Sequence, residues 1–233
     1  MKKEKAEQPC CPAEENGQQP LQPMTEFGCT TVKTARGTVC CMAIIGQIEG
    51  HNVLPHTTKT TKYEHTLPLL ASLEQNEEVD GVLFLINTVG GDVEAGLAIA
   101  ELIAGMTKPT VSLVLGGGHS IGIPLAVAPK RTFIAPSASM TLHPVRTSGT
   151  VIAAPQTYHY FEKLQESIVR FVVKNSAIGR EKFESLMLST EDMAADVGSV
   201  LYGEEAVSCG LIERVGTLHE ALECLYGMIG EKK

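Results

Sequence analysis

The segment GVLFLI at residues 81–86 carries no polar side chain. A strand of this kind has no face suited to water, so the sheet that contains it must be covered on both sides. Apolar runs of strand length also occur at 39–48 and 110–115, and segments with helical apolar spacing at 65–75 and 92–105 separate the three runs. This alternation of strand and helix predicts repeated βαβ units, and therefore an α/β fold with a mostly parallel sheet.

The second half of the chain continues the pattern with shorter elements. A long amphipathic helix follows at about 156–173, after the core already looks complete. Such a helix either covers the sheet in the ordinary way or packs against another subunit, and both interpretations stay open. The other expected elements are a buried helix at 121–128, short strands at 131–135 and 139–143, a helix at 180–188, and smaller elements at the end.

One domain accounts for most of the chain. Residues 1–35 are polar, with repeated Pro, Gln, Glu and Gly and no periodicity, so we expect a disordered or loosely attached segment. The remaining residues, 36–233, have a length that suits one large domain.

Composition excludes several classes of function. The net charge of -8 argues against nucleic-acid binding, which needs a basic surface. The longest apolar runs fall well short of the roughly 20 residues of a membrane helix, and no apolar region follows the N-terminal lysines as in a secretion signal. The seven cysteines have no zinc-site spacing. We therefore expect reduced thiols, a cytoplasmic location, no metal and no cofactor.

The stretch GGGHSIG at 116–122 places a serine two positions after the last glycine of a triplet. It is not a phosphate loop of the common types, because no lysine precedes Ser120 and the glycine spacing is wrong. Residues 118–122 do match G-x-S-x-G, which marks a nucleophilic serine on a sharp turn between a strand and a helix. The alternative is that Ser120 only caps the helix. Loops 87–92 and 116–120 both leave the carboxyl ends of predicted strands, where ligands bind in parallel sheets.

A nucleophilic serine needs a base, and two of the seven histidines are candidates. His143 ends a short apolar strand, where a core histidine would be costly without partners. His219 opens the last predicted helix. Ser120, Asp196 and His219 follow the chain order of an α/β-hydrolase, whereas Ser120, His143 and a later aspartate follow a different order. Spacing alone leaves both orders open.

Five blocks in a fixed order resemble the Clp protease proteolytic subunit, the ClpP family. The resemblance covers about residues 40–215 and is nearest to the translocation-enhancing branch of that family. It implies a ClpP/crotonase-like ββα superhelix with repeated βαβ units and a protruding long helix. The blocks are GQI at 46–48, LINTVGG at 85–91, GGHSIG at 117–122, MTLHP at 140–144 and EAVSCGLIE at 205–213.

The resemblance assigns roles to individual residues. Ser120 matches the family nucleophile and His143 matches its general base. Gly91 and Ile121 match the two backbone N–H donors of the oxyanion hole. Asn87 and Asp92 are expected to shape their loop rather than to take part in the chemistry.

The acid of the triad departs from the family pattern. An ungapped alignment puts Gly198 at its position, a shift of two residues supplies Asp196, and Asp192 is the second candidate. We predict Asp196. The departure also motivates a different hypothesis, in which the fold is a catalytically weak scaffold or adaptor that assists protein translocation.

The resemblance further implies an intracellular serine endopeptidase that cuts unfolded proteins or peptides through an acyl-enzyme. It implies a homo-oligomeric ring, a heptamer or its double, the tetradecamer. A Clp-type ATPase is the family's partner, but nothing in residues 1–35 resembles the segment that meets it. An esterase using Ser120, Asp196 and His219 remains an alternative, and a Ser–Lys peptidase using Lys130 or Lys174 has no motif behind it.

Overall fold

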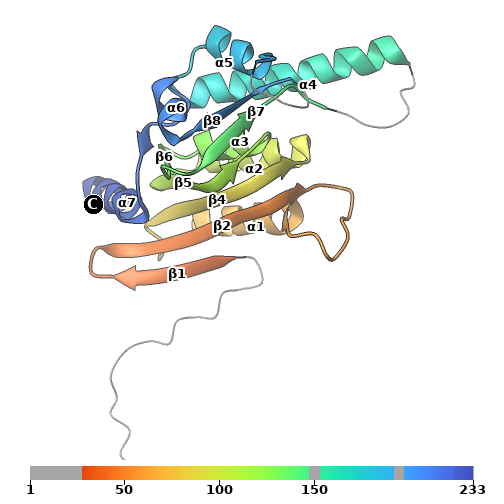
Figure 1. Ribbon diagram of the computed structural model, residues 1–233. Coiled ribbons are helices and arrows are strands. Elements are labelled where there is room, and N and C mark those ends of the chain that lie inside the picture. The colour runs from red at the N-terminus through yellow and green to blue at the C-terminus, as the bar shows by residue number, and fades with distance from the viewer. Residues whose placement is uncertain (1–27, 147–152, 192–196, 233) are drawn as a thin grey trace, which may run out of the picture.

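One sheet runs through the molecule (Figure 1). The computed structural model describes residues 28–146, 153–191 and 197–232. Along the sheet the strand order is β1-β2-β4-β5-β6-β9; β1 is antiparallel to β2, and the other neighbours are parallel. The predicted α/β fold with a mostly parallel sheet is therefore confirmed. The strands are β1 (Cys29–Thr34), β2 (Gly37–Glu49), β4 (Gly81–Gly91), β5 (Thr110–Gly118), β6 (Arg131–Ile134) and β9 (Arg214–Val215).

Three short strands lie off this path. β3 (Thr60–Lys62) pairs with β2, and β8 (Ser199–Tyr202) pairs with β7. β7 (Ser139–Leu142) also touches the main sheet, since Ser139 pairs with Gly117 near the end of β5. This single bridge brings the residues after β7 close to the residues after β5.

The helices cover both faces of the sheet (Figure 1). α1 (Tyr63–Gln75), α2 (Val93–Gly105) and α3 (Gly122–Val127) pack on one face, and α7 (Leu218–Lys232) packs on the other. At one end of the sheet, α5 (Arg180–Met187) and α6 (Gly203–Ser208) surround β7 and β8, and α4 (Ala154–Asn175) projects beyond the rest of the molecule.

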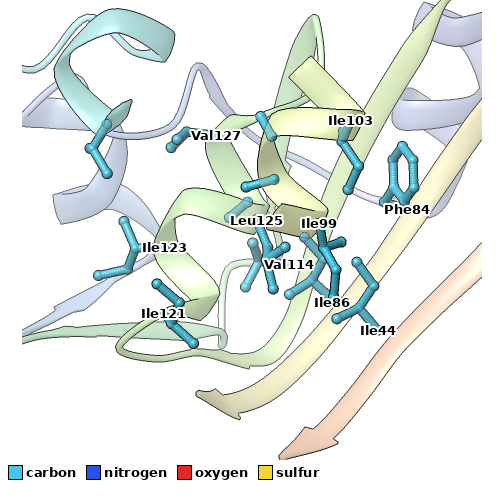
Figure 2. Packing of buried hydrophobic residues seen from close by; sticks show 14 of the residues in the cluster. Ile44, Phe84, Ile86, Ile99, Ile103, Val114, Ile121, Ile123, Leu125 and Val127 are labelled. Carbon is cyan, nitrogen blue, oxygen red and sulfur yellow. The ribbon is translucent and has the colours of Figure 1, made fainter. Parts of the chain in front are cut away.

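The expected burial of β4 on both faces is confirmed. Val82, Phe84 and Ile86 belong to the larger core cluster under α1, α2 and α3, whereas Leu83 belongs to a second cluster under α7. Figure 2 shows how Ile99 of α2 meets the residues of the strands and of α3. Because successive strand residues point to opposite faces, one apolar run supplies two cores.

The predicted long helix is α4, which is longer than expected by about two residues at each end. Its buried residues, Val169, Phe171 and Val172, lie in its second half, and the first half exposes Tyr158 and Tyr160. These exposed aromatics suit a contact with another subunit. That role remains a prediction.

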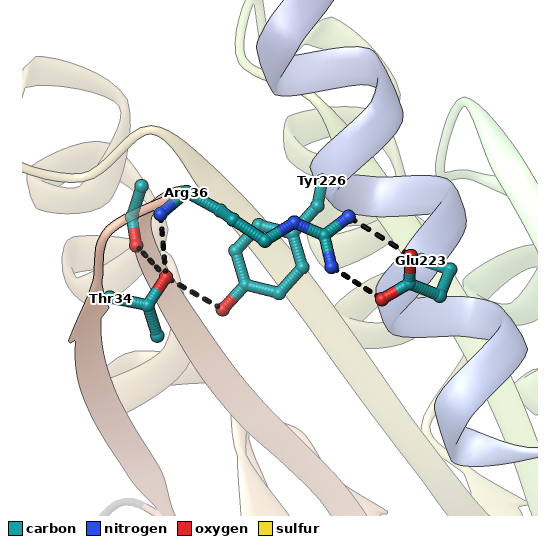
Figure 3. Close-up of polar contacts among 5 residues, drawn as sticks. Thr34, Arg36, Glu223 and Tyr226 are labelled. Carbon is teal, nitrogen blue, oxygen red and sulfur yellow. Dashed lines mark hydrogen bonds and ion pairs between the residues drawn. The ribbon is translucent and has the colours of Figure 1, made fainter.

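The first described strand lies where the sequence predicts a loosely attached segment. Residues 29–34 instead pair with β2 at six positions. The turn that follows is fixed to α7, because Arg36 forms an ion pair with Glu223 and lies 4.3 Å above the ring of Tyr226 (Figure 3). The strand is mostly exposed and is held by backbone pairing, which composition does not reveal. Residues 1–27 lie outside the described residues.

None of the helices within 28–146, 153–191 and 197–232 is long and apolar enough to cross a bilayer. Within the same ranges, no group of three or more His, Cys, Asp or Glu side chains is arranged to hold a metal ion.

Candidate active site

Ser120 lies on a sharp turn between β5 and α3. Its φ is +56°, and among the described residues other than glycine only Ala153 shares a positive φ. Such a conformation costs about 1–3 kcal/mol and persists only where neighbouring structure enforces it. Here the N–H of Ser120 donates to Thr141 O (2.9 Å) and the N–H of His119 donates to Thr88 O (3.1 Å). The turn has the form expected for G-x-S-x-G.

Glycines allow the two neighbouring loops to approach the serine closely. At Gly90, whose φ is +90°, an added Cβ would stand 2.7 Å from Ser120 Cβ. At Gly122 it would stand 2.6 Å from Thr88 Cγ2. Gly117 N–H donates to Asn87 Oδ1 (3.1 Å), which ties one loop to the other. Asn87 thus shapes the loop, as expected.

One pocket of about 170 Å³ brings together four of the predicted site residues, Gly91, Ser120, Ile121 and His143. They come from three loops that lie far apart in the sequence. Most of the remaining wall is apolar and comes from α2, α3, β7 and the segment after it, α4 and α5. It consists of Val93, Ile123, Leu142, Pro144, Val145, Arg146, Gln165, Ile168, Phe183 and Met187.

Gly91 and Ile121, which come from different loops, both line this pocket. Asp92 N–H donates to Ile48 O of β2 (3.0 Å). Successive amides of an extended strand point to opposite sides, so the N–H of Gly91 points away from β2 and toward the side of Ser120. The N–H of Ile121 donates to no acceptor within the described ranges. This pair of donors is suited to a developing negative charge.

His143 follows β7 directly and is half-buried. Its Nδ1 lies 2.7 Å from Pro144 O. Because a carbonyl oxygen can only accept, Nδ1 must carry the ring proton in this contact. Nε2 of the neutral ring is then left with a lone pair, which is the form a general base requires.

The predicted acids cannot be placed, because Asp192 and Asp196 both lie outside the described residues. Gly198, the position given by ungapped alignment, lies against the base. An added Cβ at Gly198 would stand 3.0 Å from His143 Cβ and 2.2 Å from Leu142 O.

The alternative catalytic partners do not line the pocket. His219 is at the start of α7, on the opposite face of the sheet from α3. Lys130 directs its Nζ to Thr107 O (2.6 Å), and Lys174 lies in the last turn of α4. The geometry therefore favours His143 over each of these residues as the partner of Ser120.

His119, the residue before the serine, is half-buried. Its Nδ1 lies 2.8 Å from Thr141 Oγ1, which ties the serine loop to β7, and burial lowers the pKa of its imidazole. The sequence does not identify the apolar residues of α4 and α5 that line the pocket, because no local pattern marks which residues of those helices contact it.

Asp92 caps α2, as its position at the helix N-terminus suggests. Its Oδ1 accepts from Ala95 N (2.8 Å). Asp92→Ala is expected to lower the free energy of unfolding by about 1 kcal/mol, whereas Asp92→Ser should retain most of it, because serine is also a good cap. Urea titration of both variants measures the difference. Equal losses in the two variants would contradict the capping role.

The sequence is similar to those of known proteins over most of its length. The sequence model of the family described as Clp protease matches residues 38–219. The chain is 50% identical over 214 residues to the translocation-enhancing protein TepA of Halalkalibacterium halodurans, which covers 91% of this chain and 84% of that protein.

Two ATP-dependent Clp protease proteolytic subunits 1 are more distant. The one from Chlamydia caviae is 31% identical over 136 residues, which is 54% of this chain and 71% of that protein. The one from Protochlamydia amoebophila is 28% identical over 161 residues, which is 65% of this chain and 72% of that protein. The resemblance inferred from the five sequence blocks, including its nearest branch, is confirmed. Because the family match spans well over half of the chain, the protein belongs to the Clp protease family.

Proposed function

We propose that the protein is a serine endopeptidase that hydrolyses peptide bonds of unfolded proteins or peptides through an acyl-enzyme. The observation that carries the proposal is the meeting of Ser120, His143, Gly91 and Ile121 in one pocket. Membership in the Clp protease family supports the same reaction class.

The reaction follows from the roles that each group can play. Nε2 of His143 takes the proton of Ser120 Oγ as this oxygen attacks the substrate carbonyl. The N–H groups of Gly91 and Ile121 hold the oxyanion of the tetrahedral intermediate. His143 then returns the proton to the leaving amine, and water releases the acyl group by the same steps. Asp196 is the acid that the resemblance predicts beside His143, with Asp192 as the second candidate.

The pocket wall supports a preference among substrates. Ile168 of α4 and Phe183 and Met187 of α5 face the same space as Ser120. An apolar substrate side chain next to the cleaved bond would gain about 25 cal/mol for each Å² it removes from water here. Extended, unfolded chains expose such side chains, and folded proteins bury them.

A second function is favoured by the name of one relative. The protein that is 50% identical to this chain is called translocation-enhancing. The chain would then act as a ClpP-like adaptor in protein translocation, with weak or no catalysis. In either role we expect a cytoplasmic homo-oligomer, a heptameric or tetradecameric ring, with the exposed aromatics of α4 at a subunit contact. A Clp-type ATPase remains an optional partner.

A fluorophosphonate probe is expected to label the wild-type protein at one serine and to leave Ser120→Ala unlabelled. Mass spectrometry of the labelled peptide identifies the site, and size-exclusion chromatography with light scattering measures the oligomer in the same sample. Labelling that persists in Ser120→Ala would place the reactive serine elsewhere. An unlabelled wild type, together with an undiminished effect of Ser120→Ala on translocation, would favour the adaptor.

A further inference from the structure

His119 contacts the segments that carry both the proposed nucleophile and the proposed base. It precedes Ser120 directly, and its ring nitrogen Nδ1 lies 2.8 Å from Oγ1 of Thr141, two residues before His143. The ring does not line the pocket, so it does not touch the reacting atoms. Resting on the proposed peptidase function, we propose that His119 is a positioning residue, whose contact with Thr141 holds the base in line with the nucleophile.

The strand that carries the base has little other contact with the strand that carries the serine. In the described ranges, β7 pairs with β5 through a single residue pair. Beyond that pair, Thr141 receives two contacts from the serine turn: Ser120 N–H donates to its carbonyl (2.9 Å), and the ring of His119 meets its hydroxyl. One residue separates Thr141 from His143, and consecutive Cα atoms are only about 3.8 Å apart. A shift of Thr141 therefore moves His143 with it.

The contact suits the neutral form of the histidine ring. Burial lowers the pKa of the His119 imidazole, which favours a ring with one N–H and one bare nitrogen. A hydroxyl can donate as well as accept, so Thr141 can complete the hydrogen bond with either tautomer. Both side chains are half-buried. Removing either partner therefore leaves the other with a poorly solvated polar group, which is costly.

The ring of His119 is held in place from behind by the glycine triplet. An added Cβ at Gly117 would stand 2.3 Å from Nε2 and 2.7 Å from Cδ2 of this ring. The main chain of His119 is fixed as well, because its N–H donates to Thr88 O (3.1 Å) and its carbonyl accepts from Gly122 N–H (2.8 Å). The side chain therefore has little room to turn away from Thr141.

The test removes each partner of the contact and then both. His119→Leu should lower kcat for peptide hydrolysis by about 10- to 100-fold, on the scale of a catalytic group displaced by about 1 Å. KM should change little, because the apolar wall is untouched. Thr141→Val keeps the shape of its side chain, removes the hydroxyl and should have the same effect. The double variant should lose no more than either single variant, since both substitutions remove one shared contact.

A conservative variant and a control separate positioning from stability. His119→Asn should recover most of the lost kcat, because an amide both donates and accepts near the place of Nδ1. Thr132→Val is the matched control. The hydroxyl of Thr132 is buried and accepts from Glu213 N–H (2.9 Å), and this residue lies outside the pocket. Its loss should lower the free energy of unfolding, measured by urea titration, and leave kcat unchanged.

Crystal structures of the variants test the inference without relying on activity. The separation between Ser120 Oγ and His143 Nε2 should be larger in His119→Leu and in Thr141→Val than in the wild type, and restored in His119→Asn. An unchanged separation, or a kcat in both variants equal to that of Thr132→Val, would overturn the positioning role and leave the peptidase function intact. A wild type that neither hydrolyses peptides nor reacts with a fluorophosphonate would overturn the peptidase function, and the measured separations would still support or overturn the positioning role.

Discussion

His143→Ala is expected to lower kcat for peptide hydrolysis by about 10⁶-fold, the scale on which a serine hydrolase loses activity with its base. Without the imidazole, none of the described residues that line the pocket is suited to take the proton from Ser120, so fluorophosphonate labelling should fall with hydrolysis. KM should change little, because the apolar wall that binds substrate is untouched. Steady-state kinetics on a fluorogenic peptide, together with the labelling rate, measures both quantities.

His219→Ala is the matched control for this experiment. It removes a histidine side chain that lies outside the pocket, on the other face of the sheet. Its kinetics should equal those of the wild type. Activity that survives in His143→Ala and disappears in His219→Ala would instead support the chain order of an α/β-hydrolase. Gel filtration of both variants checks that the oligomer is unchanged.

Gly91→Ala is expected to lower kcat by about 10²- to 10³-fold, the usual loss for one oxyanion donor. The φ of Gly91 is +150°, and an added Cβ would stand 2.2 Å from Ile48 O and 2.7 Å from Ile48 N. Both are backbone atoms, so the glycine loop has to move. In the proposed mechanism, the N–H of Gly91 would then no longer meet the oxyanion.

Gly105→Ala serves as the control, because an added Cβ there meets nothing within 4 Å. Thermal unfolding of both variants shows whether a lower kcat comes from a displaced loop in a folded protein or from unfolding of the protein. If Gly91→Ala folds and retains full kcat, the oxyanion is held by other groups. The substitution leaves Ser120 and His143 in place, so slow labelling should still be detectable.

The sequence predicts the parallel sheet well because its strands are unusually apolar. Because both faces of the segment GVLFLI are apolar, it favours a strand that is buried on both sides. Ser120 is also predictable, since G-x-S-x-G between a strand and a helix has few other uses. His143 is harder to identify from residue patterns alone. The rule that a core histidine needs partners leaves His143 and His219 open. The resemblance favours His143, which is also the one of the two that lines the pocket with Ser120.

Other parts of the site depend on contacts that no local pattern encodes. The approach of Gly198 to Leu142 O depends on the pairing of β7 with β8, two strands separated by more than fifty residues. The bond from His143 to Pro144 O depends on side-chain rotation rather than on spacing. The strand β1 is missed because its stability comes from backbone pairing with β2. The acid of the triad stays a prediction, since Asp196 and Asp192 lie outside the described residues.

The contact of the β1–β2 turn with α7 has a consequence for how the domain holds together. Arg36 and Glu223 join the first described strand to the last helix. The helix in turn covers the sheet cluster that contains Leu83 and Leu113. Elements near the ends of a chain usually fray first and independently. Here, loosening either element removes a contact from the other, so we expect β1 and α7 to loosen together rather than independently.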